Sequence, residues 1–168
     1  TKRIWDTESS RISKLADRFD LTKRYQYNDA LTMSYASYAP PKGNGKSPLI
    51  IWLHGGGEGG TDPSIPLMAN RAATYASDEL QAIFKGAYVL VPQCPGAWMQ
   101  NAKGTMTHGE EDDVYHVGLM ALIRDFVANH PDIDSDEIYV GGCSNGAYMS
   151  LKLILEHPEY FAAGYISA

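Results

Sequence analysis

The chain has 168 residues, of which 44% are hydrophobic and 20% charged, so it is long enough for one globular domain with a buried core. Its formal net charge is −6 and its lysines and arginines form no cluster, which argues against nucleic acid or an acidic membrane surface as a partner. The sequence has no apolar run of about 18 residues and no basic start followed by an apolar segment, so neither a membrane span nor a retained signal peptide is expected.

The N-terminal part predicts a helix followed by a hairpin. Residues 9–20 repeat apolar side chains at helical spacing, and Lys23–Tyr27 and Leu31–Tyr38 alternate as two strands around Asn28 and Asp29. The first 21 residues are therefore expected to be a helical extension. The chain begins at Thr1 rather than Met, which is compatible with a processed and exported protein; a cytoplasmic location stays open.

A continuous apolar run, Pro48–Leu53, predicts a strand that is buried on both faces and leads into a glycine loop, His54-Gly55-Gly56-Gly57-Glu58-Gly59-Gly60. Glycines without side chains let backbone N–H groups approach a carbonyl oxygen on which acyl transfer builds negative charge. We therefore expect Gly56 or Gly57 to supply one anion-stabilising donor. His54 is expected to orient this loop through hydrogen bonds rather than to shuttle protons.

The same glycines allow two other interpretations. Gly55, Gly57 and Gly60 match the spacing of the dinucleotide-binding fingerprint, with acidic residues about 20 positions further on. That fingerprint needs a helix to begin at its third glycine, whereas Pro63 and Pro66 follow here and predict a loop. No Gly-Lys-Ser/Thr closes the run, which argues against a P-loop even more strongly; a tight turn without chemistry stays open.

The middle of the chain continues the alternation of helix and strand. Ser77 is expected to cap a short helix through Phe84, Ala87–Val91 to form a strand, and residues 93–109 to form a loop. Glu110–Asp113 then open a predicted helix that runs to Asn129. Consecutive helical side chains point about 100° apart, so these four acids predict a solvated first turn rather than a metal site. The histidines lack ligand spacing as well, and we expect neither a metal nor a cofactor.

The pattern Gly-x-Ser-x-Gly occupies Gly142–Gly146, between strand-forming residues 138–140 and a helical pattern over 148–155. Ser144 is expected on the sharp turn, with its hydroxyl facing substrate and the flanking glycines letting strand and helix approach. The backbone N–H of Asn145 would be the second anion-stabilising donor. A nucleophilic Cys143 is an alternative that would sit one place off the pattern.

These two motifs resemble those of α/β-hydrolases, and residues 22–168 look closest to the esterases grouped with polyhydroxybutyrate depolymerases, feruloyl esterases and prolyl-oligopeptidase-like hydrolases. The resemblance implies an α/β fold with a mostly parallel sheet and an N-terminal antiparallel hairpin. It also implies cleavage of carboxylic esters through an acyl-enzyme, without a cofactor, by Ser144 with Gly56, Gly57 and Asn145. Residues 91–95 resemble the segment that lines the substrate cleft in that group, and the residues expected there are His54, Glu58, Gln93 and Trp98; for Trp98, packing in the core stays open.

The resemblance also implies that the catalytic acid and histidine are absent from residues 1–168. In this fold the chain order is serine, acid, histidine, but only a helix and one more strand follow Ser144. His157 lies at the far end of that helix, about 20 Å away at 1.5 Å per residue. Residues 1–168 are therefore expected to be a single domain truncated at its C-terminus, lacking the last strands and helices, the catalytic Asp and the catalytic His. This chain alone is expected to be nearly inactive.

The expected partners are a small-molecule or polymer-linked ester and the missing C-terminal segment. A prolyl-oligopeptidase-like peptidase and a non-catalytic binding module that keeps the fold stay open as alternatives. In the resembled fold, the strand before His54 separates the strands of Cys94 and Cys143, a spacing of about 9.5 Å. That distance exceeds disulfide reach, so two free thiols are favoured over a bridge.

Overall fold

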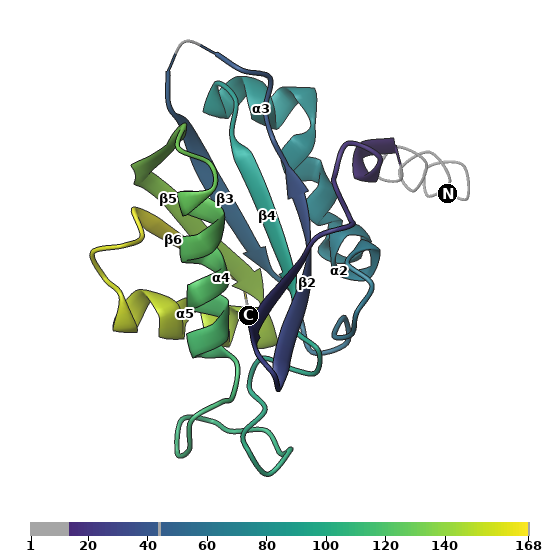
Figure 1. Cartoon of the computed structure of the whole chain (residues 1–168), viewed down its shortest axis with the longest axis vertical. Helices are drawn as coiled ribbons and strands as arrows, with labels where there is room; N and C mark the ends of the chain where they lie inside the picture. Colours follow the sequence, from purple (N-terminus) through teal and green to yellow (C-terminus); the bar gives the residue numbers. More distant parts are fainter. Residues whose placement is uncertain (1–13, 44, 168) are drawn as a thin grey trace.

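The computed structural model describes residues 14–43 and 45–167, which form one sheet with helices on both faces (Figure 1). The six strands are β1 (Arg24–Asn28), β2 (Leu31–Tyr38), β3 (Ser47–Leu53), β4 (Tyr88–Gln93), β5 (Ile133–Cys143) and β6 (Ala163–Ser167). The helices are α2 (Ser64–Met68), the 3-10 helix η1 (Ala69–Ala76), α3 (Asp78–Phe84), α4 (His116–Ala128) and α5 (Asn145–Glu156).

The sheet order is β1-β2-β4-β3-β5-β6. The β1–β2 and β2–β4 pairs are antiparallel, whereas β4, β3, β5 and β6 run parallel to one another. The predicted mostly parallel sheet with an antiparallel N-terminal hairpin is confirmed. Since Leu53 pairs with Gly142 in neighbouring parallel strands, the turns that follow β3 and β5 meet at one edge of the sheet.

Two apolar clusters hold helices against opposite faces of the sheet. The larger contains the buried faces of α4 and α5 against β2, β3, β4 and β5 residues, including Leu49, Ile51, Leu90, Ile123 and Met149. The smaller packs the N-terminal segment, α2 and η1 on residues including Ala36, Trp52, Val89 and Val91. Strand β3 contributes alternate side chains to both clusters, which is why its sequence is apolar from Pro48 to Leu53.

The prediction that residues 61–66 form a loop is wrong for residues 64–66, which are helical. Helix α2 begins at Ser64, directly after Pro63, and contains Pro66 in its first turn. The first backbone N–H groups of any helix have no intrahelical partner, so a proline there removes no hydrogen bond. The glycine loop is still not followed at once by a helix, since Thr61 and Asp62 intervene.

The prediction that Glu110–Asp113 form the first turn of a helix is wrong. Helix α4 begins at His116, and residues 110–112 lie in irregular structure before it. Asp113 is buried rather than solvated, and its Oδ1 accepts the backbone N–H groups of Tyr115 at 2.9 Å and His116 at 2.8 Å. Its carboxylate thus caps the helix from outside, which leaves the three preceding acids in the loop.

Several other sequence predictions are confirmed. The hairpin has the expected strands, Ser77 caps α3 by accepting the backbone N–H of Leu80, and β3 separates the strands of Cys94 and Cys143, both of which are free thiols. Of the predicted N-terminal helix, residues 14–16 are helical and residues 9–13 lie outside the described residues. Within the described ranges, no helix combines the length and apolar character that crossing a bilayer requires.

Candidate active site

Ser144 occupies the turn between β5 and α5 in a backbone conformation that side chains rarely adopt, with φ 50° and ψ −113°. Ser144 is exposed, although Gly142 before it and residues 145–147 after it are buried. The backbone N–H of Ser144 donates to the carbonyl of Ser167 at the end of β6, at 2.8 Å. Strand pairing therefore holds the turn in a conformation that costs on the order of 1–3 kcal/mol.

The two glycines beside Ser144 allow helix α5 to approach β3. A Cβ atom added to Gly146 would lie 2.1 Å from the carbonyl oxygen of Leu53, and one added to Gly142 would lie 2.6 Å from that oxygen. Backbone atoms of a central strand cannot move aside as a flexible side chain can. Glycine is thus required at both positions by close packing, as the motif predicts.

The glycine loop after β3 lies beside the start of α5. A Cβ atom placed on Gly56 would be 3.8 Å from Cβ of Asn145, and Gly56 and Gly57 are both exposed. Asn145 is the first residue of α5, so its N–H is one of those that have no partner within the helix. Exposed Ser144, Gly56 and the N-terminus of α5 thus border the same surface region, where a helix N-terminus favours negative charge.

His54 is fully buried beneath this loop. Its Nε2 accepts the backbone N–H of Cys94 at 2.9 Å, so in the neutral ring Nδ1 carries the proton and donates to the carbonyl of Gly55 at 2.6 Å. Burial lowers the pKa of His54, against the opposing effect of the hydrogen bond to Gly55. The ring therefore ties the turn after β3 to the end of β4, in line with its predicted orienting role.

Three of the four residues expected in a substrate cleft lie inside the protein instead. His54, Gln93 and Trp98 have no exposed surface. Gln93 accepts the hydroxyl of Ser34 at 2.8 Å and donates to the carbonyl of Glu58 at 3.0 Å, and the Trp98 ring lies 5.1 Å from that of His54. These side chains hold the glycine loop from below, and of the four only Glu58 is partly exposed.

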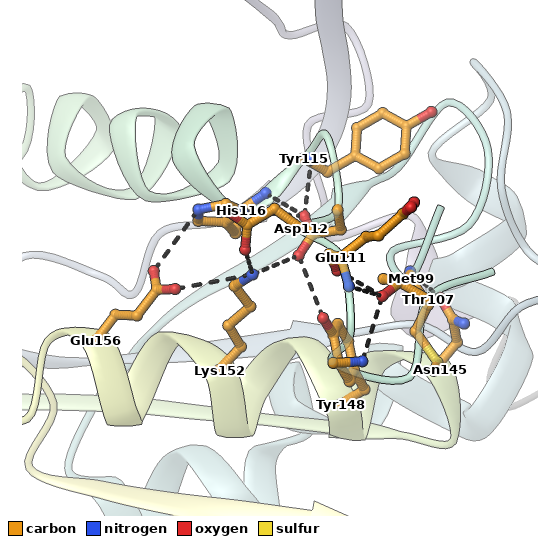
Figure 2. Close-up of polar contacts among 12 residues, drawn as sticks. Met99, Thr107, Glu111, Asp112, Tyr115, His116, Asn145, Tyr148, Lys152 and Glu156 are labelled. Carbon is orange, nitrogen blue, oxygen red and sulfur yellow. Dashed lines mark hydrogen bonds and ion pairs between the residues drawn. The ribbon is translucent and has the colours of Figure 1, made fainter. Parts of the chain in front are cut away.

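One set of contacts was missed by sequence reasoning. Side chains along one face of α5 bind the segment that leads into α4: Asn145, Tyr148 and Lys152 contact the connection between β4 and α4, and Glu156 contacts His116, the first residue of α4 (Figure 2). Their spacing places them on one face of a helix, which is a signal that could have been read. Helical spacing could not have identified Asp113, the partner of Tyr148 and Lys152, because it is far from α5 in the sequence and only the tertiary structure brings it to that helix.

Among residues 14–43 and 45–167, no three His, Cys, Asp or Glu side chains are grouped so that they could hold a metal ion. Asp113 and Glu156 instead contact Lys152, at 3.2 Å and 3.8 Å.

The buried neutral His54 predicts a pH dependence of folding stability. Because its pKa is lowered from an ordinary 6.5, the unfolded chain binds this proton more readily. Its contribution to stability is therefore present above about pH 6.5 and lost as the pH falls toward the folded value. Urea unfolding of the wild type at about pH 7.5 and about pH 5 should show this loss, and the His54→Gln variant should show a smaller difference between the two pH values. An equal difference in both proteins would contradict the prediction.

Comparison with known proteins agrees with this architecture. The prolyl oligopeptidase family matches residues 92–168. Feruloyl esterase B of Neurospora crassa is 32% identical over 128 residues, which is 76% of this chain and 41% of that protein. Acetylxylan esterase A of Aspergillus ficuum is 29% identical over 92 residues, covering 55% of this chain and 29% of that protein. The chain thus spans about two fifths or less of the length of these curated relatives.

Solved structures share the fold. A thermostable esterase superposes with a TM-score of 0.78 at 27% identity, covering 90% of this chain and 41% of that one. An acetyl xylan esterase from Aspergillus awamori gives 0.58 at 19% identity, covering 86% of this chain and 50% of that one, which indicates the fold alone. With its mixed sheet and its turn at Ser144, this chain has the α/β-hydrolase fold, and it is similar to these esterases and, over residues 92–168, to the prolyl oligopeptidase family.

Proposed function

We propose that this chain carries the nucleophile and the anion-stabilising amides of a serine hydrolase that cleaves carboxylic esters through an acyl-enzyme. The observation that carries the proposal is the exposed Ser144, held at φ 50° where Gly56 and the N-terminus of α5 meet. The hydroxyl oxygen of Ser144 attacks the ester carbonyl, and the alcohol leaves. Water then attacks the acyl-enzyme, releasing the acid and free Ser144.

The oxyanion that forms in each step lies against backbone N–H groups. One donor is Asn145 and the other is Gly56 or Gly57. Losing a single donor of this kind typically costs about 2.7–4 kcal/mol of transition-state stabilisation. Gly56 is favoured over Gly57 because it lies beside the other proposed donor: a Cβ placed on Gly56 would be 3.8 Å from Cβ of Asn145, whereas one placed on Gly57 has no neighbour within 4 Å.

The general base and the acid that orients it are proposed to lie on polypeptide that follows Ala168, within the same catalytic domain as residues 1–168. Both ring nitrogens of His54 are engaged by backbone groups inside the protein. His157 caps the far end of α5, about 20 Å from Ser144 at 1.5 Å per residue. The chain also spans only 41% of the feruloyl esterase that it resembles, which leaves room for both groups.

The substrate is proposed to be an ester of a small acyl group, either free or attached to a carbohydrate polymer, because the curated relatives carry the names feruloyl esterase and acetylxylan esterase. A peptidase is the second candidate, since the prolyl oligopeptidase family matches residues 92–168. The two reactions use the same nucleophile, so substrate tests are needed to separate them.

The experiment uses the longest polypeptide that the gene encodes. A fluorophosphonate should attach covalently to it, and mass spectrometry of the digested adduct should locate the label on Ser144. Hydrolysis of p-nitrophenyl acetate and methyl ferulate, with no cleavage of Pro-containing p-nitroanilides, would support the esterase. Cleavage of the peptides alone would favour the peptidase, and absence of both label and hydrolysis would indicate a non-catalytic module.

A further inference from the structure

The helix that follows Ser144 is bound along one face by the connection between β4 and α4. At its start, Oδ1 of Asn145 accepts the backbone N–H of Met99 at 3.3 Å. About two turns later, Nζ of Lys152 lies 2.9 Å from Asp112 and 3.2 Å from Asp113. Figure 2 shows Lys152 extending from α5 toward Asp112, with Glu156 beside it. The connection is thus attached to α5 at two places.

The attachment at Lys152 is a largely buried ion pair. The side chain of Asp113 has 0% and that of Lys152 14% of its surface exposed. Burial alone would lower the pKa of Lys152, but its hydrogen bonds to Asp112 and Asp113 outweigh burial and raise that pKa. Removing one partner of such a pair leaves a buried charge uncompensated, which is strongly destabilising. Lys152 therefore stays charged and holds Asp113, which in turn caps α4.

Between the two attachments, the connection is shaped by its own buried polar groups. Oδ1 of Asn101 accepts the backbone N–H groups of Lys103 and Thr105, and the hydroxyl of Thr107 accepts those of Gly109 and Glu111. Asn101 and Thr107 are both buried. Buried polar groups satisfied in this way favour one loop conformation over others.

This loop conformation fixes the position of Met106. Its thioether sulfur lies 4.0 Å from Nδ2 of Asn145, although 46% of the residue is exposed. The backbone of Thr107, next to it, donates to the carbonyl of Met99 at 2.8 Å. An apolar, adaptable side chain is thereby held at the surface beside the first residue of α5.

We propose that Met106 contacts the apolar arm of the ester substrate, and that Asp113 and Lys152 are positioning residues that hold its loop against α5. The proposal rests on the proposed function, because a carbonyl bound to the N–H of Asn145 must extend its substituents over the neighbouring surface. Met106 then favours esters with a longer acyl chain or an aryl alcohol over esters that are short on both sides.

The first test measures binding without turnover. In a Ser144→Ala background of the longest gene product, calorimetry compares Kd for ethyl acetate, p-nitrophenyl acetate and ethyl hexanoate. Met106→Ala should raise Kd about 5- to 20-fold for either the aryl ester or the hexanoate. A rise for the aryl ester would place Met106 beside the alcohol group of the substrate, and a rise for the hexanoate would place it beside the acyl group. Ethyl acetate should change by less than about 2-fold. The control is Met68→Ala on α2, an exposed methionine outside this surface, which should change none of them.

The second test concerns the positioning residues. The ester to follow is the one whose Kd rises in Met106→Ala. Lys152→Met should raise KM for that ester about as much as Met106→Ala does, with KM for ethyl acetate unchanged within about 2-fold. Lys152→Arg should return KM for that ester to the wild-type value. Lys23→Met, which removes an exposed pair with Asp20 at 3.9 Å, is the matched control. Circular dichroism checks that each variant folds; if Lys152→Met does not, the arginine variant and Met106→Ala still decide.

The outcomes separate this inference from the proposed function. If Met106→Ala left Kd for all three esters equal to that of its parent protein, the contact would be overturned, whether or not Ser144 is the nucleophile. An equal rise in KM for all three esters in Lys152→Met would show that Lys152 is merely structural. Unchanged hydrolysis in Ser144→Ala would instead overturn the proposed nucleophile, and KM of Met106→Ala for the same three esters, compared with KM of its parent protein, would then decide the role of Met106.

Discussion

Replacing Ser144 by alanine is expected to reduce kcat/KM for p-nitrophenyl acetate by at least about 10⁴-fold in the longest polypeptide that the gene encodes. In the proposed mechanism the hydroxyl oxygen is the atom that forms the acyl-enzyme, and this substitution removes it. A residual rate above that in water is expected if the amides of Asn145 and of Gly56 or Gly57 stabilise the oxyanion as proposed. Initial rates of p-nitrophenol release measure kcat/KM and the residual rate, and a burst phase in the wild type indicates the acyl-enzyme.

The control for this substitution is Ser135→Ala, an exposed serine on β5 that should keep full activity. A stability measurement adds an independent check. Because Ser144 holds φ 50°, which glycine adopts without strain, Ser144→Gly should be more stable than Ser144→Ala by about 1 kcal/mol. Wild-type rates in Ser144→Ala would refute the proposed nucleophile, and equal stability of the two variants would refute the claim of backbone strain.

Replacing Gly146 by alanine is expected to destabilise the protein by about 3 kcal/mol or more. The sign is informative, because glycine to alanine in a helix normally stabilises by about 1 kcal/mol. Here the new Cβ would meet the carbonyl oxygens of Leu53 at 2.1 Å and His54 at 2.6 Å, so α5 must shift away from β3. A shift of about 1 Å at Asn145 should also cost about 10²-fold in esterase activity.

Urea unfolding at constant pH measures the stability change, and p-nitrophenyl acetate hydrolysis by the folded fraction measures the activity change. The matched control is Gly43→Ala, because a Cβ there meets nothing within 4 Å and the glycine has no positive φ. That variant should be neutral or slightly more stable. If Gly146→Ala were as stable as Gly43→Ala, the close approach of α5 to β3 would be wrong.

The elements that were predicted correctly carry their signal locally. The β3 strand is apolar from Pro48 to Leu53 because both faces are covered, and Ser77 is a helix cap that acts within its own turn. The turn at Ser144 belongs to the same class, since Gly142 and Gly146 follow from the need of a strand and a helix to pack closely. Periodicity, caps and glycines therefore identified the fold and the turn.

The errors arose where distant contacts outweigh local propensity. Glu110–Asp113 looked like a helix start, but Lys152 on α5 draws Asp112 and Asp113 toward itself, and the helix begins after them. Most of the extra length of β5 was missed because residues 134–137 are polar and mostly exposed. Gln93 was expected in a cleft and is buried, and the burial of Trp98 was left open, because a buried side chain and a cleft side chain look alike in sequence.

The sequence by itself determined the alternation of strands and helices, the parallel sheet and the turn that presents Ser144, because each depends on residue types within a few positions of one another. Only the tertiary structure decided that the glycine loop lies beside Asn145, that His54 is buried and doubly hydrogen-bonded, and that Lys152 fastens the loop bearing Met106 to the helix after Ser144. These contacts join residues far apart in the chain. Their geometry follows from strand order and helix packing, which no local pattern specifies.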